Sequence, residues 1–452
     1  MVKKSHLAFT FLVLLGINTV NFYDRQVLGA VQENVRKEWG LSDSELGWLG
    51  TAFILLYAIV GLPLGRLADR ARRKWVLAAG VGLWSALTVA SGFAWNFWSL
   101  FVLRLGGGVG EATCAPVASS LIGDLVPAER RARAMSVFML GLPVGLALSF
   151  FVSGRVAEHH GWPAAFFVAG VPGLLLAVAA LFLPDPARGG ADQKSERMKE
   201  EGGRMNEDKN PADSSFIVHP SSFGTVARHV LRLPTMWWII VSGALHNFNM
   251  YALGAFISSF LIRYHGLSIG RAGEISALIY GFGALGIFAA GWLGDLAFRR
   301  RVSGRLHVAW IGLAAAIPCL LLALEAPPGA VWPCVAGLLP GCLLLYAYYG
   351  TVYATIQDVV EPSMRGTAMA IYFCAMYCLG AALGPVGTGW VSDFLSRRAA
   401  AYDGAAVVSE VHKAVGLHDA MYLIPALDAA LVVVLFAASR TVTRDVKRRA
   451  LL

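Results

Sequence analysis

The chain has 452 residues, of which 56% are hydrophobic and 15% charged, and its mean hydropathy is +0.59. Soluble domains carry about 25% charged residues, so this composition excludes a chain of ordinary water-soluble domains. The formal net charge of +9 alone would be compatible with nucleic-acid binding. The basic residues lie mostly on one side of the predicted membrane spans, which explains the net charge without nucleic acid. We therefore expect an integral membrane protein with no nucleic-acid partner.

The opening stretch, MVKKSHLAFTFLVLLGINTVNFYDRQ, is basic and then apolar, as a signal peptide is. It lacks a small-residue cleavage site, and its apolar run continues too far for a signal peptide. We therefore predict that it is the first membrane span.

Apolar runs long enough to cross about 30 Å of hydrocarbon form two groups of six. They lie near 7–31, 46–67, 76–95, 97–123, 134–157 and 163–183, and then near 235–262, 274–296, 306–324, 331–358, 367–394 and 418–440. This predicts an all-α membrane protein with twelve transmembrane helices in two six-helix bundles, within 1–183 and 234–440.

Residues 184–233 separate the two groups. The stretch ARGGADQKSERMKEEGGRMNEDKNPADSS is polar and mixed in charge, which predicts a disordered linker. The following SSFGTVARHVLRLPT has apolar residues at helical spacing and predicts a helix along the membrane surface. The last residues, 441–452, are expected to form a cytoplasmic tail.

Most of the 38 lysines and arginines fall on one side of this arrangement if the N-terminus is inside the cell. The positive-inside rule therefore predicts that both termini and the linker are cytoplasmic. We expect a multi-pass protein of the bacterial inner (plasma) membrane that acts as a monomer.

The two halves contain similar segments at equivalent places. The segment GDLVPAERRARAM (123–135) after the fourth span matches QDVVEPSMRGTAM (357–369) after the tenth. Gly65 and Asp69, after the second span, match Gly291 and Asp295 after the eighth. Such matches are typical of two parallel six-helix repeats.

The segment LRLGGGVGEATCAPVA (103–118) carries two charges inside an apolar run, Arg104 and Glu111. Seven residues separate them, so on a helix they share a face about 10 Å apart. Each charge at bilayer depth costs at least about 2.5–3.5 kcal/mol and should face a partner or a wet cavity. The pair predicts a transport pathway or, alternatively, an ion pair that only locks the fold.

Asp24 lies at a depth in the first span similar to that of Arg104 in the fourth, so we expect the two to pair. Separating them in a dehydrated pocket would let the acid take a proton. Asp24 is the candidate proton acceptor, with Glu111 as a second, and static pairing is the alternative. Arg25 points about 100° away from Asp24 and is expected to meet a phosphate or to snorkel to the lipid interface.

The second half has few charges within its spans and offers hydrogen-bonding and aromatic side chains instead. Candidate substrate-binding residues there are His246, Asn247, Asn249, Tyr349 and Tyr353, which together with Arg25, Arg104 and Glu111 would suit an anionic head and an apolar tail. Core packing is the alternative for the tyrosines. Asp428 in the last span is a proton site or, alternatively, a structural residue.

A third group of residues follows the spans on the predicted cytoplasmic side. Pairs that form across the bundles and break again would close that side in one state. The candidate gate residues are Gly65, Asp69, Arg70, Arg73, Arg131, Asp295 and Arg365. For the basic residues, orientation in the membrane and contact with anionic lipid are the alternative.

GLPLGRLADRARRK (61–74) resembles the loop between the second and third spans of the major facilitator superfamily. NFYDRQVLGAV (21–31) and the stretch 104–138 are similar to the spinster-like lipid transporters of that superfamily. The resemblance implies the major facilitator fold, alternating access, and a lysophospholipid or sphingosine-phosphate-like cargo.

These observations predict a secondary transporter of an amphiphilic anionic lipid, coupled to protons. Small organic anions, sugar phosphates or drugs are alternative cargoes, and a lipid-modifying membrane enzyme is a further alternative. The sequence shows no nucleophile with a base and no phosphate-binding glycine loop, so we expect neither an enzyme nor a cofactor. The six cysteines lack ligand spacing, and we expect no metal.

Overall fold

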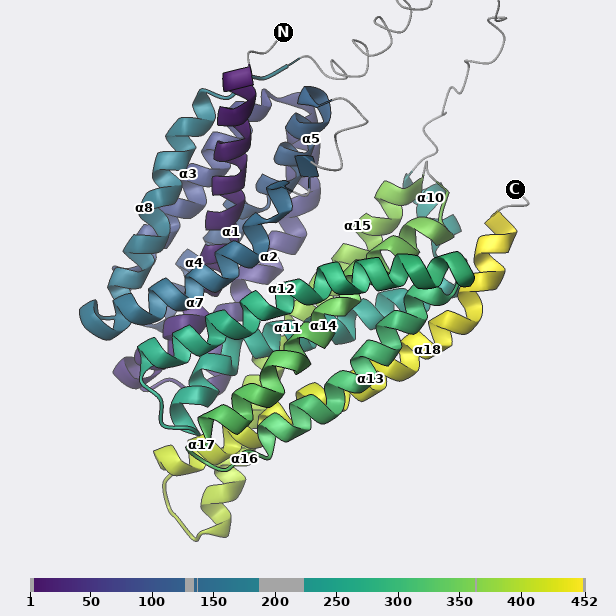
Figure 1. Ribbon diagram of the computed structural model, residues 1–452. Coiled ribbons are helices and arrows are strands. Elements are labelled where there is room, and N and C mark those ends of the chain that lie inside the picture. Colours follow the sequence, from purple (N-terminus) through teal and green to yellow (C-terminus); the bar gives the residue numbers. More distant parts are fainter. Residues whose placement is uncertain (1–3, 127–133, 136, 187–222, 362–363, 450–452) are drawn as a thin grey trace, which may run out of the picture.

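The computed structural model describes residues 4–126, 134–135, 137–186, 223–361 and 364–449. Within these it gives only the backbone of 4–5, 58, 61–70, 223, 225–226 and 448–449. The described residues form helices and no strand. Figure 1 shows two bundles, α1 to α8 and α11 to α18. The start of α1 and the end of α18 lie at the same end of the molecule, which we call the termini end. We call the other end of the molecule the opposite end.

The helices of the first bundle follow the six apolar runs in order. They are α1 (Lys4–Trp39), α2 (Asp43–Arg70), α3 (Arg73–Ser91), α4 (Phe97–Glu111), α5 (Cys114–Leu125), α7 (Gly141–His160) and α8 (Trp162–Leu181). The predicted linker lies mostly outside the described residues. The short helix expected after it is α10 (Phe223–Val230).

The second bundle repeats this order. Its elements are α11 (Pro234–Arg263), α12 (Ile269–Arg300), α13 (Gly304–Leu324), α14 (Val331–Val359), α15 (Arg365–Ala375), the π-helix η2 (Met376–Ala381), α16 (Leu383–Tyr402), α17 (Glu410–Met421) and α18 (Leu423–Arg449). Nine helical segments in the described chain are long and apolar enough to cross a membrane. The other three predicted runs hold α2, α4 with α5, and α11.

Two of the predicted spans are interrupted. The run 97–123 breaks after Glu111, because Pro116 has no N–H to donate to the carbonyl of Ala112, and α5 begins after a turn. The run 367–394 contains the π-helix η2 between α15 and α16. Such single turns of π-helix occur often at functional sites.

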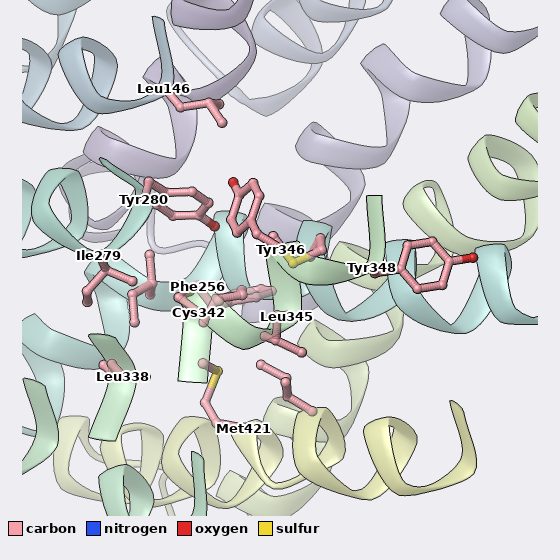
Figure 2. Packing of buried hydrophobic residues seen from close by; sticks show 14 of the residues in the cluster. Leu146, Phe256, Ile279, Tyr280, Leu338, Cys342, Leu345, Tyr346, Tyr348 and Met421 are labelled. Atoms are coloured by element: carbon pink, nitrogen blue, oxygen red, sulfur yellow. The ribbon is translucent and has the colours of Figure 1, made fainter. Parts of the chain in front are cut away.

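Apolar side chains both fill the bundles and cover them. Figure 2 shows part of one buried cluster, whose members include Phe256, Cys342, Leu345 and Met421. The same cluster continues into the first bundle, where Phe150 stacks on Tyr280 of α12 with ring centroids 5.1 Å apart. Outside, large side chains such as Phe288 and Trp292 are more than half exposed. Lipid accounts for such a surface, which soluble monomers rarely have.

The bundles contact each other toward the opposite end. There α1 packs against α11, α2 against α16, and α7 against α12. Glycines allow the close approach: a side chain on Gly29 would strike the carbonyl of Gly254, and one on Gly273 the carbonyl of Phe150. Toward the termini end the bundles diverge (Figure 1).

Adjacent glycines in α4 provide a test of its packing. A Cβ at Gly108 would clash with the carbonyl oxygen of Phe53 in α2, whereas a Cβ at Gly107 would meet no atom within 4 Å. We expect Gly108→Ala to lose about 1–3 kcal/mol of stability through overpacking. Gly107→Ala should be neutral or gain up to about 1 kcal/mol from helix propensity. Thermal unfolding of the purified variants measures both, and equal effects would contradict the packing.

Candidate functional site

Two ion pairs link α1 to α4 in the middle of the first bundle. Arg104 Nη1 lies 3.2 Å from Asp24 Oδ1 and 3.3 Å from the Asp24 carbonyl oxygen. Arg25 Nε donates to Glu111 Oε2 at 2.8 Å. Asp24 and Glu111 are 1% exposed and Arg104 is 4% exposed. Each helix thus supplies one acid and one base, and each charge is neutralised by the other helix.

The pairing of Asp24 with Arg104 is as the sequence predicted, but the position of Arg25 is not. The Arg25 side chain is 7% exposed and pairs with Glu111, so it does not snorkel to the lipid interface. Its guanidinium also lies over the rings of Tyr57 and Phe22, 4.5 and 4.9 Å from their centroids. Helical spacing predicts the direction in which the Arg25 side chain points. Only the fold shows that α4 lies in that direction.

The ion pairs leave hydrogen-bonding capacity unused. Asp24 Oδ2, Glu111 Oε1 and Arg104 Nε are buried without a partner in the described protein. A cavity of about 40 Å³, large enough for a few water molecules, lies beside the pairs. Arg25 and Arg104 line it from the first bundle and Tyr251 from the second, so it lies between the bundles. The two arginines therefore face a space that both bundles share.

Four of the predicted residues of the second bundle, His246, Asn247, Tyr349 and Tyr353, lie in an aromatic cluster with Tyr348. His246 stacks on Tyr348 with ring centroids 4.0 Å apart, and neither His246 nor Asn249 is exposed. Tyr349 and Tyr353 are partly exposed, and their rings lie 5.7 Å apart. Asn247 Oδ1 accepts from the Tyr349 hydroxyl at 3.5 Å. Tyr349 and Tyr353 are therefore at the surface of the cluster, with His246 and Asn247 behind them, whereas Asn249 donates to the Ile424 carbonyl of α18.

Comparison with known proteins identifies the family. Residues 14–385 match the model of the Major Facilitator Superfamily. The chain belongs to this superfamily. It is 29% identical over 415 residues to the bovine (Bos taurus) protein spinster homolog 1, covering 87% of this chain and 75% of that one. It is 26% identical to an MFS-type efflux pump of Mycolicibacterium smegmatis, covering 85% and 84%.

A solved structure extends the likeness to the fold. A bacterial homologue of the human lysosomal transporter Spinster, crystallised in an inward-facing and unoccupied conformation, superposes with a TM-score of 0.84. The identity is 25%, and the match covers 98% of this chain and 99% of that chain. The predicted fold, two helix bundles of the major facilitator type, and the resemblance to spinster-like proteins are confirmed. This protein is a multi-pass membrane transporter.

At the termini end of this facilitator, the predicted gate residues with described side chains contact residues of their own bundle. Arg73 Nε lies 3.0 Å from Asp185 Oδ1, and Arg73 also pairs with Asp124. Asp295 Oδ1 lies 2.7 Å from Arg305 Nη2, and Arg365 Nε donates to the Gln357 carbonyl at 3.1 Å. Only the backbone of Gly65, Asp69 and Arg70 is described, and Arg131 lies outside the described residues.

At the opposite end, a network of charges that the sequence analysis missed joins the bundles. Arg263 of α11 contacts Asp43 of α2 at 2.7 and 2.9 Å and Glu33 of α1 at 2.8 Å. Arg36 of α1 pairs with Glu410 of α17. These residues lie at helix ends where loop charges are ordinary, so only the fold singles them out.

A helix terminus adds to this network. The first two N–H groups of α2, on Asp43 and Ser44, donate to the carboxylate of Asp393 in α16 at 3.0 and 2.8 Å. A carboxylate at a helix N-terminus is favourable because it meets unsatisfied donors and the positive end of the helix dipole. Here the capping carboxylate comes from the other bundle. We call the contacts of Glu33, Arg36, Asp43, Arg263, Asp393 and Glu410 the interbundle latch.

The Arg25–Glu111 pair predicts a double-mutant pattern. Removing one partner leaves a buried charge uncompensated, so Arg25→Gln and Glu111→Gln should each lose about 3–5 kcal/mol, and the double variant should recover much of it. Arg155→Gln is the control, because Arg155 forms an exposed pair with Glu274 and should lose at most about 1 kcal/mol. Thermal unfolding measures these losses. Single-variant losses no larger than the control would show that the buried pair is not coupled.

Proposed function

We propose that this facilitator is a proton-coupled secondary transporter of an amphiphilic anionic lipid, such as a lysophospholipid or a sphingosine-phosphate-like molecule. The observation that carries the proposal is the position of Arg25 and Arg104. Both guanidinium groups line the cavity between the bundles, and both are already paired with carboxylates. An anionic head group would compete with those carboxylates for the two arginines.

This competition supplies a route to proton coupling. Guanidinium groups bind carboxylate and phosphate with similar geometry, so an anion on Arg104 or Arg25 would displace Asp24 or Glu111. A displaced carboxylate in a dehydrated site is stable only if it takes a proton. Asp24 and Glu111 would then carry the coupled protons, and Arg104 would alternate between acid and cargo. Binding of the anion and binding of the proton would support each other.

The second bundle supplies the surface for the apolar part of the cargo. Tyr349 and Tyr353 are partly exposed and would contact the acyl chain with their rings. His246 and Asn247 would position Tyr349, because one packs against its ring and the other accepts from its hydroxyl. Asn249 would hold α11 against α18, since its amide donates to the Ile424 carbonyl at 3.0 Å.

Alternating access would use both ends of the molecule. With the termini in the cytoplasm of a bacterial cell, the interbundle latch would close the outer side, and the bundles would diverge toward the cytoplasm. In the outward-open state the latch would break. Arg73, Asp295 and Arg365 would then change partners, together with the other gate residues, Gly65, Asp69, Arg70 and Arg131, and close the cytoplasmic side. We propose that the monomer completes this cycle in the inner membrane, with membrane lipids around it.

A drug-like anion is the second candidate cargo. The relative in Mycolicibacterium smegmatis that is named an efflux pump favours it. A panel of lysophospholipids, sphingosine phosphate, sugar phosphates and amphiphilic drugs separates the two classes by ligand-induced thermal stabilisation of the purified protein. We expect the lysolipids or the sphingolipid to stabilise it and the sugar phosphates to have no effect. Stabilisation by drugs alone would overturn the lipid proposal.

Proton coupling is tested with Asp24→Asn in proteoliposomes. The variant keeps the shape of the side chain but cannot exchange a proton, so uptake of the stabilising lipid driven by a pH gradient should stop. Binding, measured by thermal shift, should remain. Asp445→Asn is the control, because Asp445 is also buried but lies in α18, hydrogen-bonded by Thr235. Gradient-driven uptake at the rate of the unmodified protein would remove Asp24 from the mechanism.

The interbundle latch predicts a conformational shift. Arg263→Gln removes the cation that joins Asp43 to Glu33 and leaves Glu33 paired with Arg36 of its own helix. The closed outer side should therefore open more often. The distance between spin labels at Lys37 and Tyr402, in a background without the native cysteines, should lengthen. Arg271→Gln is the control, because Arg271 is exposed and its ion pair lies within α12. An unchanged distance distribution would show that the latch does not hold the two bundles together.

A further inference from the structure

A second buried acid lies in the other bundle, away from the paired charges. Asp428 of α18 is 0% exposed and belongs to the helix face that also buries Ile424 and Leu431. Neither carboxylate oxygen of Asp428 has a hydrogen-bond partner in the described part of the chain. This environment differs from that of the other acids within the bundles.

A second buried aspartate of α18, Asp445, shows how a buried carboxylate is satisfied on the same helix. Asp445, 1% exposed on the same helix, accepts from the Thr235 N–H at 3.0 Å and from the Thr235 hydroxyl at 2.6 Å. In the first bundle, Asp24 and Glu111 each face an arginine. Among the described residues, Asp428 has neither a hydrogen-bond donor nor a cation. Its burial is therefore uncompensated if the group is ionised.

The helices around Asp428 do not supply a counter-charge. α11, α13 and α14 pack against α18. Their charged residues Arg263, Arg305 and Asp358 lie toward helix ends, where they form ion pairs. The titratable side chains between those ends are His246 and Tyr251 on α11, His307 and Cys319 on α13, and Cys334, Cys342, Tyr346, Tyr348, Tyr349 and Tyr353 on α14.

Other unpartnered polar atoms lie on the neighbouring helix. Asn249 donates its amide to the Ile424 carbonyl, one turn before Asp428, and its Oδ1 has no partner. Both ring nitrogens of His246, one turn along α11, are also unpartnered. Asn249 Oδ1 is an acceptor, and a neutral His246 ring carries one acceptor nitrogen and one N–H. A proton on Asp428 would add a further donor, because a neutral carboxyl has an O–H to donate.

We propose that Asp428 is a proton-binding site inside the second bundle and is held as a neutral carboxylic acid in this conformation. The physical reason is that an unpaired carboxylate in an apolar interior neutralises rather than remain charged. A metal ion is a poor substitute, because no three potential ligands among His, Cys, Asp and Glu gather in the described residues. The proposal concerns a different bundle from Asp24 and does not depend on transport.

Two matched variants test it, Asp428→Asn and Asp445→Asn, with infrared spectroscopy of the purified protein at neutral pH. The carbonyl stretch of a protonated carboxyl should be present in the unmodified protein, absent in Asp428→Asn and retained in Asp445→Asn. An unchanged band in Asp428→Asn would overturn the proposal. If Asp428→Asn does not fold, isotopically labelled aspartate in the Asp24→Asn protein decides. A protonated aspartate band is then expected, and its absence would overturn the proposal equally.

Thermal unfolding gives a second readout with a defined sign. A group that holds its proton more tightly when folded contributes stability at low pH that is lost as the pH rises. The unmodified protein should therefore lose stability from mildly acidic to alkaline pH, and Asp428→Asn should lose less. Asp445→Asn should be less stable throughout but keep the full slope. Equal slopes for the Asp428 variant and the unmodified protein would contradict the proposal, whatever the outcome of the transport assays.

Discussion

Neutralising charge in a low-dielectric interior is the constraint on which this structure depends. Four charged residues, Asp24, Arg25, Arg104 and Glu111, lie inside a bundle whose outer surface is apolar. Each is stable there because α1 and α4 place acids and bases at the same level of the bundle. A buried pair of this kind is costly to break and contributes little net stability over an apolar pair. Its presence beside a cavity shared by both bundles is the basis of the proposed anion site.

The same constraint explains why the two ends of the molecule differ. At the opposite end, Arg263 and Asp393 satisfy acids and helix N–H groups of the other bundle, so these polar groups are buried only while the bundles touch. At the termini end, Arg73 and Arg305 satisfy acids of their own bundles. Contacts across the bundles exist only while the bundles touch, whereas contacts within a bundle do not need the other bundle. The structure therefore has its bundles joined at the opposite end and apart at the termini end.

The internal repeat has a structural meaning at the termini end. Asp124 and Asp358, which match in the two halves of the sequence, each pair with an arginine at the start of a neighbouring helix, Arg73 of α3 and Arg305 of α13. The central charges have no such equivalent. The middle of the first bundle holds the two ion pairs of α1 and α4. The second bundle holds the tyrosine cluster and Asp428, which has no hydrogen-bond partner among the described residues. The repeats thus share their scaffold and differ in the chemistry of their interiors.

The sequence alone determined the all-helical membrane fold, the two groups of spans, and the pairing of Asp24 with Arg104, because apolar run length, loop charge and depth along a helix are one-dimensional quantities. It could not determine the partner of Arg25, the burial of His246 and Asn249, or the latch around Arg263 and Asp393. Those depend on which helices are neighbours and how they are rotated. Tertiary structure decided them, since hydrogen bonds and ion pairs form only between side chains that packing brings within about 3 Å.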